Sequence, residues 1–259
     1  MTSRNIKDVL VLIAGPGAGK GTILRSLQKE YGHVPISTGD AITEFSNPDN
    51  RLYGIIQSAS GPLHIAHKAA ERTIESYNQG ELASTKDIRI LIEAKRQLEG
   101  SPRKIALDGF PRQVEQSKVL DDILQTPFDV RYMDVSDENL EFRQGLRRDK
   151  KIRELVSEKT FGIYQKITSE DEKIAYIESV LQQSLLQVGV RRTDLTREAR
   201  LKRIAVFRNE TVPAAKYFSK EPFYKEFNGN VTPKEAYLHF KATFTMLSQM
   251  KESLYKKPA

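Results

Sequence analysis

The chain has 259 residues, enough for one core domain with insertions or for two small domains. It is 39% hydrophobic and 29% charged, as a globular protein is, and no apolar run approaches the roughly 20 residues that cross a bilayer, so we expect no membrane contact. The absence of cysteine excludes disulfides and cysteine-ligated zinc and is compatible with a cytoplasmic location. A net charge of +7 fits a protein that binds phosphates, either in nucleotides or in nucleic acid.

Short apolar runs alternate with helical patterns along most of the chain. The predicted strands are residues 7–14, 34–37, 103–108, 129–135 and 224–227. The predicted helices are 20–31, 84–100 and 114–124, one that begins after Ser136, and one that begins with the capping box TPKE at 232–235. Strands that alternate with helices of this length predict a three-layer α/β/α fold around a parallel sheet. Ligands of such sheets bind at the carboxyl ends of the strands.

Two segments interrupt the alternation. Residues 44–80 contain the turn-rich stretch FSNPDN and a long helical run, and residues 149–189 are charged and patterned as helices. Both segments read as helical excursions from the sheet and not as new domains. We therefore predict a single domain over 1–259.

A glycine-rich loop follows the first predicted strand, in the sequence IAGPGAGKGT over residues 13–22. A strand, such a loop and a helix that starts with lysine form a phosphate-binding site, because successive backbone N–H groups and the helix N-terminus point at the anion. Lys20 adds a positive charge for the outer phosphates, and the Thr22 hydroxyl can reach a metal ion. The strict pattern G-x-x-x-x-G-K-[ST] has glycine where this chain has Ala14, and no residue like Gly21 between the lysine and the threonine. The plain alternative is an ordinary glycine-rich turn.

Further motifs follow in a fixed order. They are GPGAGKGT, ISTGD (36–40), GELAS (80–84), LDGFPR (107–112) with Gln116, FRQGLRR (142–148), RRTD (191–194) with Arg203, and NETVP with KYF (209–218). With these motifs the chain resembles the adenylate kinase and nucleoside monophosphate kinase family of P-loop proteins. The resemblance implies core regions at 7–43, 81–148 and 190–250, an acceptor-binding flap at 44–80 and a lid insertion at 149–189.

The resemblance also implies an activity, the transfer of the γ-phosphoryl group of ATP to AMP with Mg²⁺, by a monomer that needs no zinc. The residues implied in ATP binding are Gly15, Gly17, Ala18, Gly19, Lys20, Gly21, Thr22 and Arg143. Those implied in AMP binding are Thr38, Ala83, Gly109, Arg112 and Gln116. Those implied in catalysis are Lys20, Arg147, Arg192 and Arg203. Thr22 and Asp108 would hold the Mg²⁺, partly through water. By the same resemblance, Thr38 and Gln116 mark AMP-directed members, since pyrimidine-directed relatives tend to carry alanine and asparagine there.

Two departures from the family pattern stand out. The family usually has an arginine three residues after STGD, where this chain has Thr43. We expect a substitute cation from Arg51, Lys68 or Arg72. The lid segment lacks the cysteines and short strands of the common lid, and its positions Ile174, Ile177, Leu181 and Leu185 recur at helical spacing and predict a packed seam.

Three other functions stay open at this point. The chain can be a kinase for another monophosphate such as UMP or CMP, or a nucleotide-binding regulatory module whose catalysis has weakened. Retention of the lid-side arginines argues against the regulatory module, since a protein that only binds nucleotide needs fewer of them. An RNA-associated factor would use the basic surface, but no aromatic residues are interleaved with the charges, so we do not expect a nucleic-acid partner.

Overall fold

The computed structural model describes residues 8–46, 62–78, 83–124, 126–182 and 196–243. Their centre is a five-stranded sheet in the order β2-β3-β1-β4-β5, parallel in every pairing. The strands are β1 (Asp8–Ala14), β2 (Val34–Ser37), β3 (Lys104–Asp108), β4 (Phe128–Asp134) and β5 (Tyr224–Asn228). Each lies within one residue of its predicted bounds. The central strand β1 is buried from its second residue to its last, as its continuous apolar sequence indicates.

The helices connect the strands and cover the sheet. They are α1 (Lys20–Tyr31), α2 (Thr38–Ser46), α4 (Pro62–Asn78), α5 (Thr85–Leu98), α6 (Val114–Lys118), α7 (Leu120–Leu124), α8 (Asp137–Leu155), α9 (Glu158–Lys166), α10 (Glu170–Leu181), α12 (Arg197–Val206), the π-helical turn η2 (Phe207–Thr211), α13 (Val212–Lys216), and a last helix described over 233–243. Ser84 and Ser136 accept hydrogen bonds from backbone N–H groups in the first turns of α5 and α8, as their sequence positions predict. The single helix predicted over 114–124 is wrong, because the chain leaves the helical path at Val119 and forms α6 and α7.

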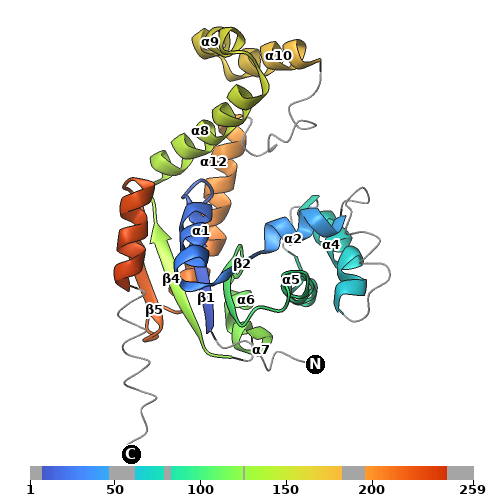
Figure 1. The fold of residues 1–259 in the computed structure, drawn as a ribbon, viewed down its shortest axis with the longest axis vertical. Helices are drawn as coiled ribbons and strands as arrows, with labels where there is room; N and C mark the ends of the chain where they lie inside the picture. Colours follow the sequence, from blue (N-terminus) through green and yellow to red (C-terminus); the bar gives the residue numbers. More distant parts are fainter. Residues whose placement is uncertain (1–7, 47–61, 79–82, 125, 183–195, 244–259) are drawn as a thin grey trace, which may run out of the picture.

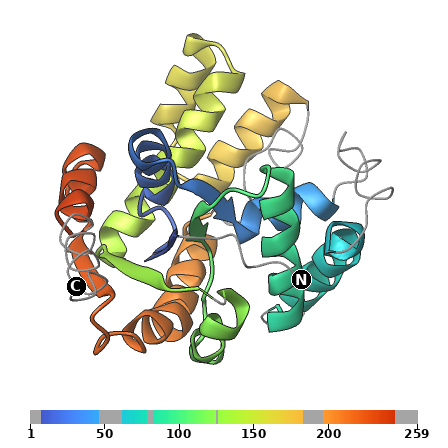
Figure 2. The same ribbon diagram turned by 60° about the horizontal axis from the view of Figure 1, so that its bottom comes forward.

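The sheet lies between two layers of helices, which confirms the predicted α/β/α fold (Figures 1 and 2). On one face, α1 is joined to the last helix by an ion pair of 2.8 Å between Lys241 and Glu30. On the opposite face, α6 is joined to α13, where the Ser117 hydroxyl donates to the carbonyl of Ala214 at 3.0 Å. Helices α2, α4 and α5 pack together beside the edge strand β2. Helix α4 confirms the helical run predicted within 44–80.

Helices α8 and α12 pack against each other and extend together beyond the sheet (Figure 1). Helix α8 runs without a break across the predicted start of the lid at 149. At its far end, α9 and α10, the distal helices, form a small core together with α8, around buried Ile152, Phe161, Tyr164 and Ile177. Ile174 and Leu181 pack against this core, as the predicted seam requires, and Leu185 lies outside the described residues.

The glycine loop after β1 packs directly on α8. A Cβ on Gly17 would lie 2.8 Å from the carbonyl oxygen of Leu140, and the φ of Gly17 is +81°. A Cβ on Gly15 would lie 2.6 Å from the Leu140 side chain. Both positions therefore need glycine, one for its backbone angle and both for close contact. The separation between the loop and α8 depends on these missing side chains.

We expect Gly17→Ala to destabilise the protein by about 1–3 kcal/mol or more, because alanine is strained at positive φ and its methyl group meets the backbone of α8. The measurement is urea unfolding followed by circular dichroism. The control is Gly145→Ala in α8, where a Cβ meets nothing within 4 Å and the free energy of unfolding should rise by about 0.5–1 kcal/mol. Equal stability of the Gly17 variant and the wild type would contradict this account of the loop.

Candidate functional site

Strand pairing brings an acidic side chain next to the glycine loop. In the register of β1 and β3, Asp108 lies opposite Leu12, two residues before the end of β1. Lys20 begins α1 immediately after the loop, and its Nζ lies 3.7 Å from Oδ1 of Asp108. The same ammonium group donates to the carbonyl oxygens of Ala14 at 2.9 Å and Gly15 at 3.3 Å. The lysine is thus held against the loop at the carboxyl ends of β1 and β3.

Three arginines from distant parts of the chain lie close to Lys20. Burial lowers the pKa of Lys20 below its ordinary value of 10.5, Asp108 raises it, and the positive charges of Arg112, Arg203 and Arg147 lower it further. These four basic residues, here called the cation cluster, come from α1, the turn after β3, α8 and α12. Three positive charges and one carboxylate act on Lys20, so the charge balance at the site favours a highly charged anion.

The loop itself adds further positive character. Gly15, Gly17, Ala18 and Gly19 lie between β1 and α1, and Gly21 and Thr22 lie in the first turn of α1. That turn contains no acidic residue, so the positive end of the helix dipole is left for a ligand. The loop and the cation cluster together fit a phosphate chain.

The residues present also fit a magnesium ion. Oδ1 of Asp108 is buried with no hydrogen-bond partner, and the Thr22 hydroxyl lies in the first turn of α1, where Arg25 donates to it at 3.3 Å. A carboxylate and a hydroxyl are the hard oxygen ligands that Mg²⁺ takes, with water and phosphate oxygens completing its octahedron. The described residues contain no group of three or more His, Cys, Asp or Glu side chains that could hold a metal ion.

The turn after β3 gathers the predicted acceptor residues. The Thr38 hydroxyl donates to the carbonyl oxygen of Gly109 at 3.1 Å, and Nε of Arg112 donates to the same oxygen at 2.8 Å. Oε1 of buried Gln116 accepts from the backbone N–H of Arg112 at 2.7 Å, and the Thr211 hydroxyl donates to the carbonyl of Arg112 at 3.2 Å. The backbone of Arg112 is held on both sides. The sequence reading did not single out Thr211, although it lies in the NETVP motif.

Arg143 lies where the donor side of the site is expected. Its guanidinium group donates to the carbonyl of Ala18 at 3.1 Å and to those of Gly229 and Val231 at 2.9 Å each. It therefore connects the glycine loop to the segment after β5. Its stacking on adenine remains a prediction.

A family model described as the AAA domain matches residues 13–162, more than half of the chain. The chain belongs to this family.

Curated relatives indicate which members of the family the chain resembles. The adenylate kinase of Thermodesulfovibrio yellowstonii is 28% identical over 85% of this chain and 91% of its own, and that of Vanderwaltozyma polyspora is 29% identical over 89% and 93%. UMP-CMP kinase 1 of Oryza sativa subsp. japonica is 23% identical over 94% of this chain and 76% of its own. The chain is a divergent member of the adenylate kinase and nucleoside monophosphate kinase family, as its motifs predicted.

Several residues named from the sequence lie outside the described residues or on other parts of the fold. Arg192 lies outside the described residues, as does Arg51, one of the substitute cations. Ala83 is buried just before α5. Thr43 is exposed, and its hydroxyl donates to the carbonyl of Gly39 at 3.1 Å.

Arg72, another proposed substitute cation, is already paired. Its Nε donates to both carboxylate oxygens of Asp87 at 3.2 Å, which joins α4 to α5. Hydrogen bonds from Arg72 and Ser84 outweigh the burial of Asp87 and hold the pKa of this carboxylate below its ordinary value. Of the two substitute cations outside this pair, Lys68 is exposed on α4 and Arg51 lies outside the described residues.

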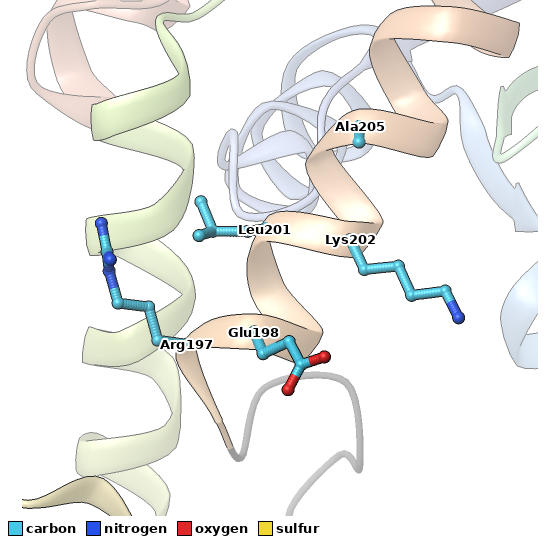
Figure 3. A pocket seen from close by; sticks show the side chains of 5 residues that line it. All are labelled: Arg197, Glu198, Leu201, Lys202 and Ala205. Carbon is cyan, nitrogen blue, oxygen red and sulfur yellow. The ribbon is translucent and has the colours of Figure 1, made fainter.

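A shallow hollow on α12 is a weaker candidate for the site. Its lining residues are Arg197, Glu198, Leu201, Lys202 and Ala205, all on one helix. Figure 3 shows Arg197 reaching toward α8 and Lys202 projecting from the other side of α12. The cation cluster draws on four separate elements, so we place the site there. None of the described helices is both long enough and apolar enough to span a bilayer.

We expect inorganic tripolyphosphate with Mg²⁺ to raise the melting temperature of this protein, since a ligand at 100 times its dissociation constant stabilises by about 2.7 kcal/mol. Lys20→Met should lose most of that shift. The control is Lys104→Met, at the opposite end of β3, which should keep the full shift. The measurement is scanning calorimetry with and without ligand. A full shift in the Lys20 variant would contradict the anion site.

Proposed function

We propose that the protein is a magnesium-dependent phosphotransferase that moves the γ-phosphoryl group of ATP to AMP and forms two ADP. The observation that carries this proposal is the cation cluster, Lys20, Arg112, Arg147 and Arg203, beside Asp108 and the glycine loop. A protein that only binds nucleotide does not need positive charges gathered from four separate elements. Two of the relatives named above are adenylate kinases, which supports AMP as the acceptor.

The reaction follows from electrostatics and positioning. The transferring phosphoryl group spreads its charge over three oxygens, and fixed cations in a water-poor site stabilise that charge without reorganising. In this proposal the loop N–H groups and Lys20 hold the donor phosphates, Arg112 binds the acceptor phosphate, and Arg147 and Arg203 face the group in transfer. Magnesium, when held by Thr22 and Asp108, neutralises charge on the donor phosphates. No general base among the protein side chains is needed.

Acceptor choice would come from the turn after β3. Thr38 and Gln116 are buried there and hydrogen-bond to the turn, so their positions are fixed before a base arrives. The bond from Arg112 occupies one acceptor position of Gln116 and leaves the NH₂ group to donate to a ring nitrogen of the base. A second candidate acceptor is a pyrimidine monophosphate, favoured by Thr43 in place of the usual arginine and by the similarity to a UMP-CMP kinase.

The first test is ADP formation with ATP, Mg²⁺ and each of AMP, CMP and UMP in a coupled assay. AMP should be the best acceptor and EDTA should stop the reaction, while ATP alone measures background hydrolysis. The double variant Thr38→Ala/Gln116→Asn should shift the preference toward CMP and UMP. Faster turnover with UMP than with AMP in the wild type would favour the second candidate, and no ADP with any acceptor would refute the kinase.

A second test addresses the transition state. Arg203→Ala should lower kcat by about 10³-fold or more, the range measured for arginines that contact a transferring phosphoryl group. The KM for ATP should change far less. The control is Lys202→Ala, the exposed neighbour on α12, which should leave kcat within twofold of the wild type. If the two variants turn over equally fast, Arg203 has no part in catalysis.

A further inference from the structure

Glu170, the first residue of α10, connects three helices. Its Oε1 accepts hydrogen bonds from Nη1 of Arg148 on α8 at 2.9 Å and from Nη2 of Arg200 on α12 at 2.7 Å. Its Oε2 accepts from the backbone N–H of Arg197, the first residue of α12. One carboxylate thus bonds to two guanidinium groups and to the N-terminus of a ten-residue helix. These four residues are here called the Glu170 cluster.

Two of the cluster's guanidinium groups are shielded from solvent, whereas Arg197 has an exposed side chain and takes part through its backbone N–H. The side chains of Arg148 and Arg200 are 5% and 6% exposed, and that of Glu170 is 27% exposed. Burial opposes the ionisation of Glu170, but the hydrogen bonds from Arg200 and Arg148 outweigh it and hold the pKa of Glu170 below its ordinary 4.5. The carboxylate is therefore charged at neutral pH. Removal of its charge would leave two buried guanidinium groups without this partner, which is costly.

The distal helices are attached to the rest of the molecule in two different ways. Helix α9 is attached to α8 by its apolar side chains and by the Tyr164 hydroxyl, which donates to Asp149 at 2.5 Å. Helix α10 contributes Ile177 to the same small core, but its bonds to α12 come through Glu170. Glu141, on α8, pairs with Arg197 at 2.7 Å and joins α8 to α12 without involving the distal helices.

The cluster is adjacent to the catalytic arginines in sequence and in space. Arg148 follows Arg147 on α8, and Arg200 precedes Arg203 by one turn of α12. The positive charges of Arg147 and Arg203 both lower the pKa of Lys20, the lysine beside the glycine loop. A bond that ties Arg148 to Arg200 therefore also fixes the spacing of the two helices that carry Arg147 and Arg203.

We propose that Glu170 is a positioning residue that ties the distal helices to α8 and α12 and so sets the geometry of Arg147 and Arg203. Its effect on the rate rests on the proposed phosphotransfer, whereas its effect on the distal helices does not. Glu170 itself is not expected to touch the nucleotide. It acts through the two guanidinium groups.

The position of the distal helices can be measured without any reaction. The chain has no cysteine, so Gln165→Cys on α9 and Lys29→Cys on α1, both exposed, accept two spin labels uniquely. Electron–electron distance measurements without nucleotide should give a narrow distribution for the wild type and one at least twice as broad for Glu170→Gln. Glu172→Gln, an exposed glutamate in the same turn of α10, is the matched control and should match the wild type.

Glu170→Asp keeps the charge but is one methylene shorter, so it should broaden the distribution even if Glu170→Gln does not fold. Wild-type distributions for both Glu170 variants would overturn the proposal. In the coupled assay, Glu170→Asp should lower kcat about tenfold or more, with the KM for AMP unchanged, because misplaced cations act mainly on the transition state. A raised KM for AMP with unchanged kcat would overturn the positioning role. If the wild type transfers no phosphate at all, the proposed function fails while the distance measurement still decides the role of Glu170.

Discussion

The close contact between the glycine loop and α8 is the constraint on which the rest of the site depends. Gly15 and Gly17 carry no Cβ, so the loop lies against the side chain and backbone of Leu140. Any larger residue at Gly17 would push α8 outward, and with it Arg143 and Arg147. Phe207, at the start of η2, also lies against Gly15, which brings the end of α12 to the same loop. The glycine loop thus serves as the packing surface for the helices that carry Arg147 and Arg203, the arginines to which we assign a catalytic role.

The positive charges of the cation cluster repel one another when no anion is bound. Lys20, Arg112, Arg147 and Arg203 repel one another in a partly buried place, and Asp108 offsets only part of that repulsion. In the proposed reaction, bound phosphate groups would offset this repulsion, because the phosphate oxygens would meet cations that are already in place. The acceptor side is prepared similarly. Gln116 and Thr211 hold the backbone of Arg112 before any acceptor is present.

The distal helices α9 and α10 are attached to the rest of the protein by a small core and by charged hydrogen bonds. The core between α8 and the distal helices contains only four buried side chains, a small apolar contact for two helices. Charged hydrogen bonds at Glu170 and at Asp149 supplement that core. Zinc-ligating cysteines are absent from the sequence, and here a partly buried carboxylate between two arginines joins the helices. Such a bond is directional, so it sets an angle between helices as well as holding them together.

Local patterns in the sequence were enough to predict the strands, most helix starts and the phosphate loop. Apolar runs, serine caps and glycine spacing depend on residues that are close together in the sequence. Each predicted strand therefore lies within one residue of its observed bounds. The helical pattern of residues 114–124 did not reveal the break at Val119, which divides the segment into the two short helices α6 and α7. Motif order singled out Arg112, Arg147 and Arg203 as candidates, but only the fold brings their charges to bear on Lys20, since these residues are far apart in the chain. The same holds for Glu170, whose partners lie 22 and 30 residues away. A bond between residues that are distant in the chain leaves no periodic signal in the sequence. The sequence by itself therefore determined which residue types are available to the site, and tertiary packing decided where their side chains lie.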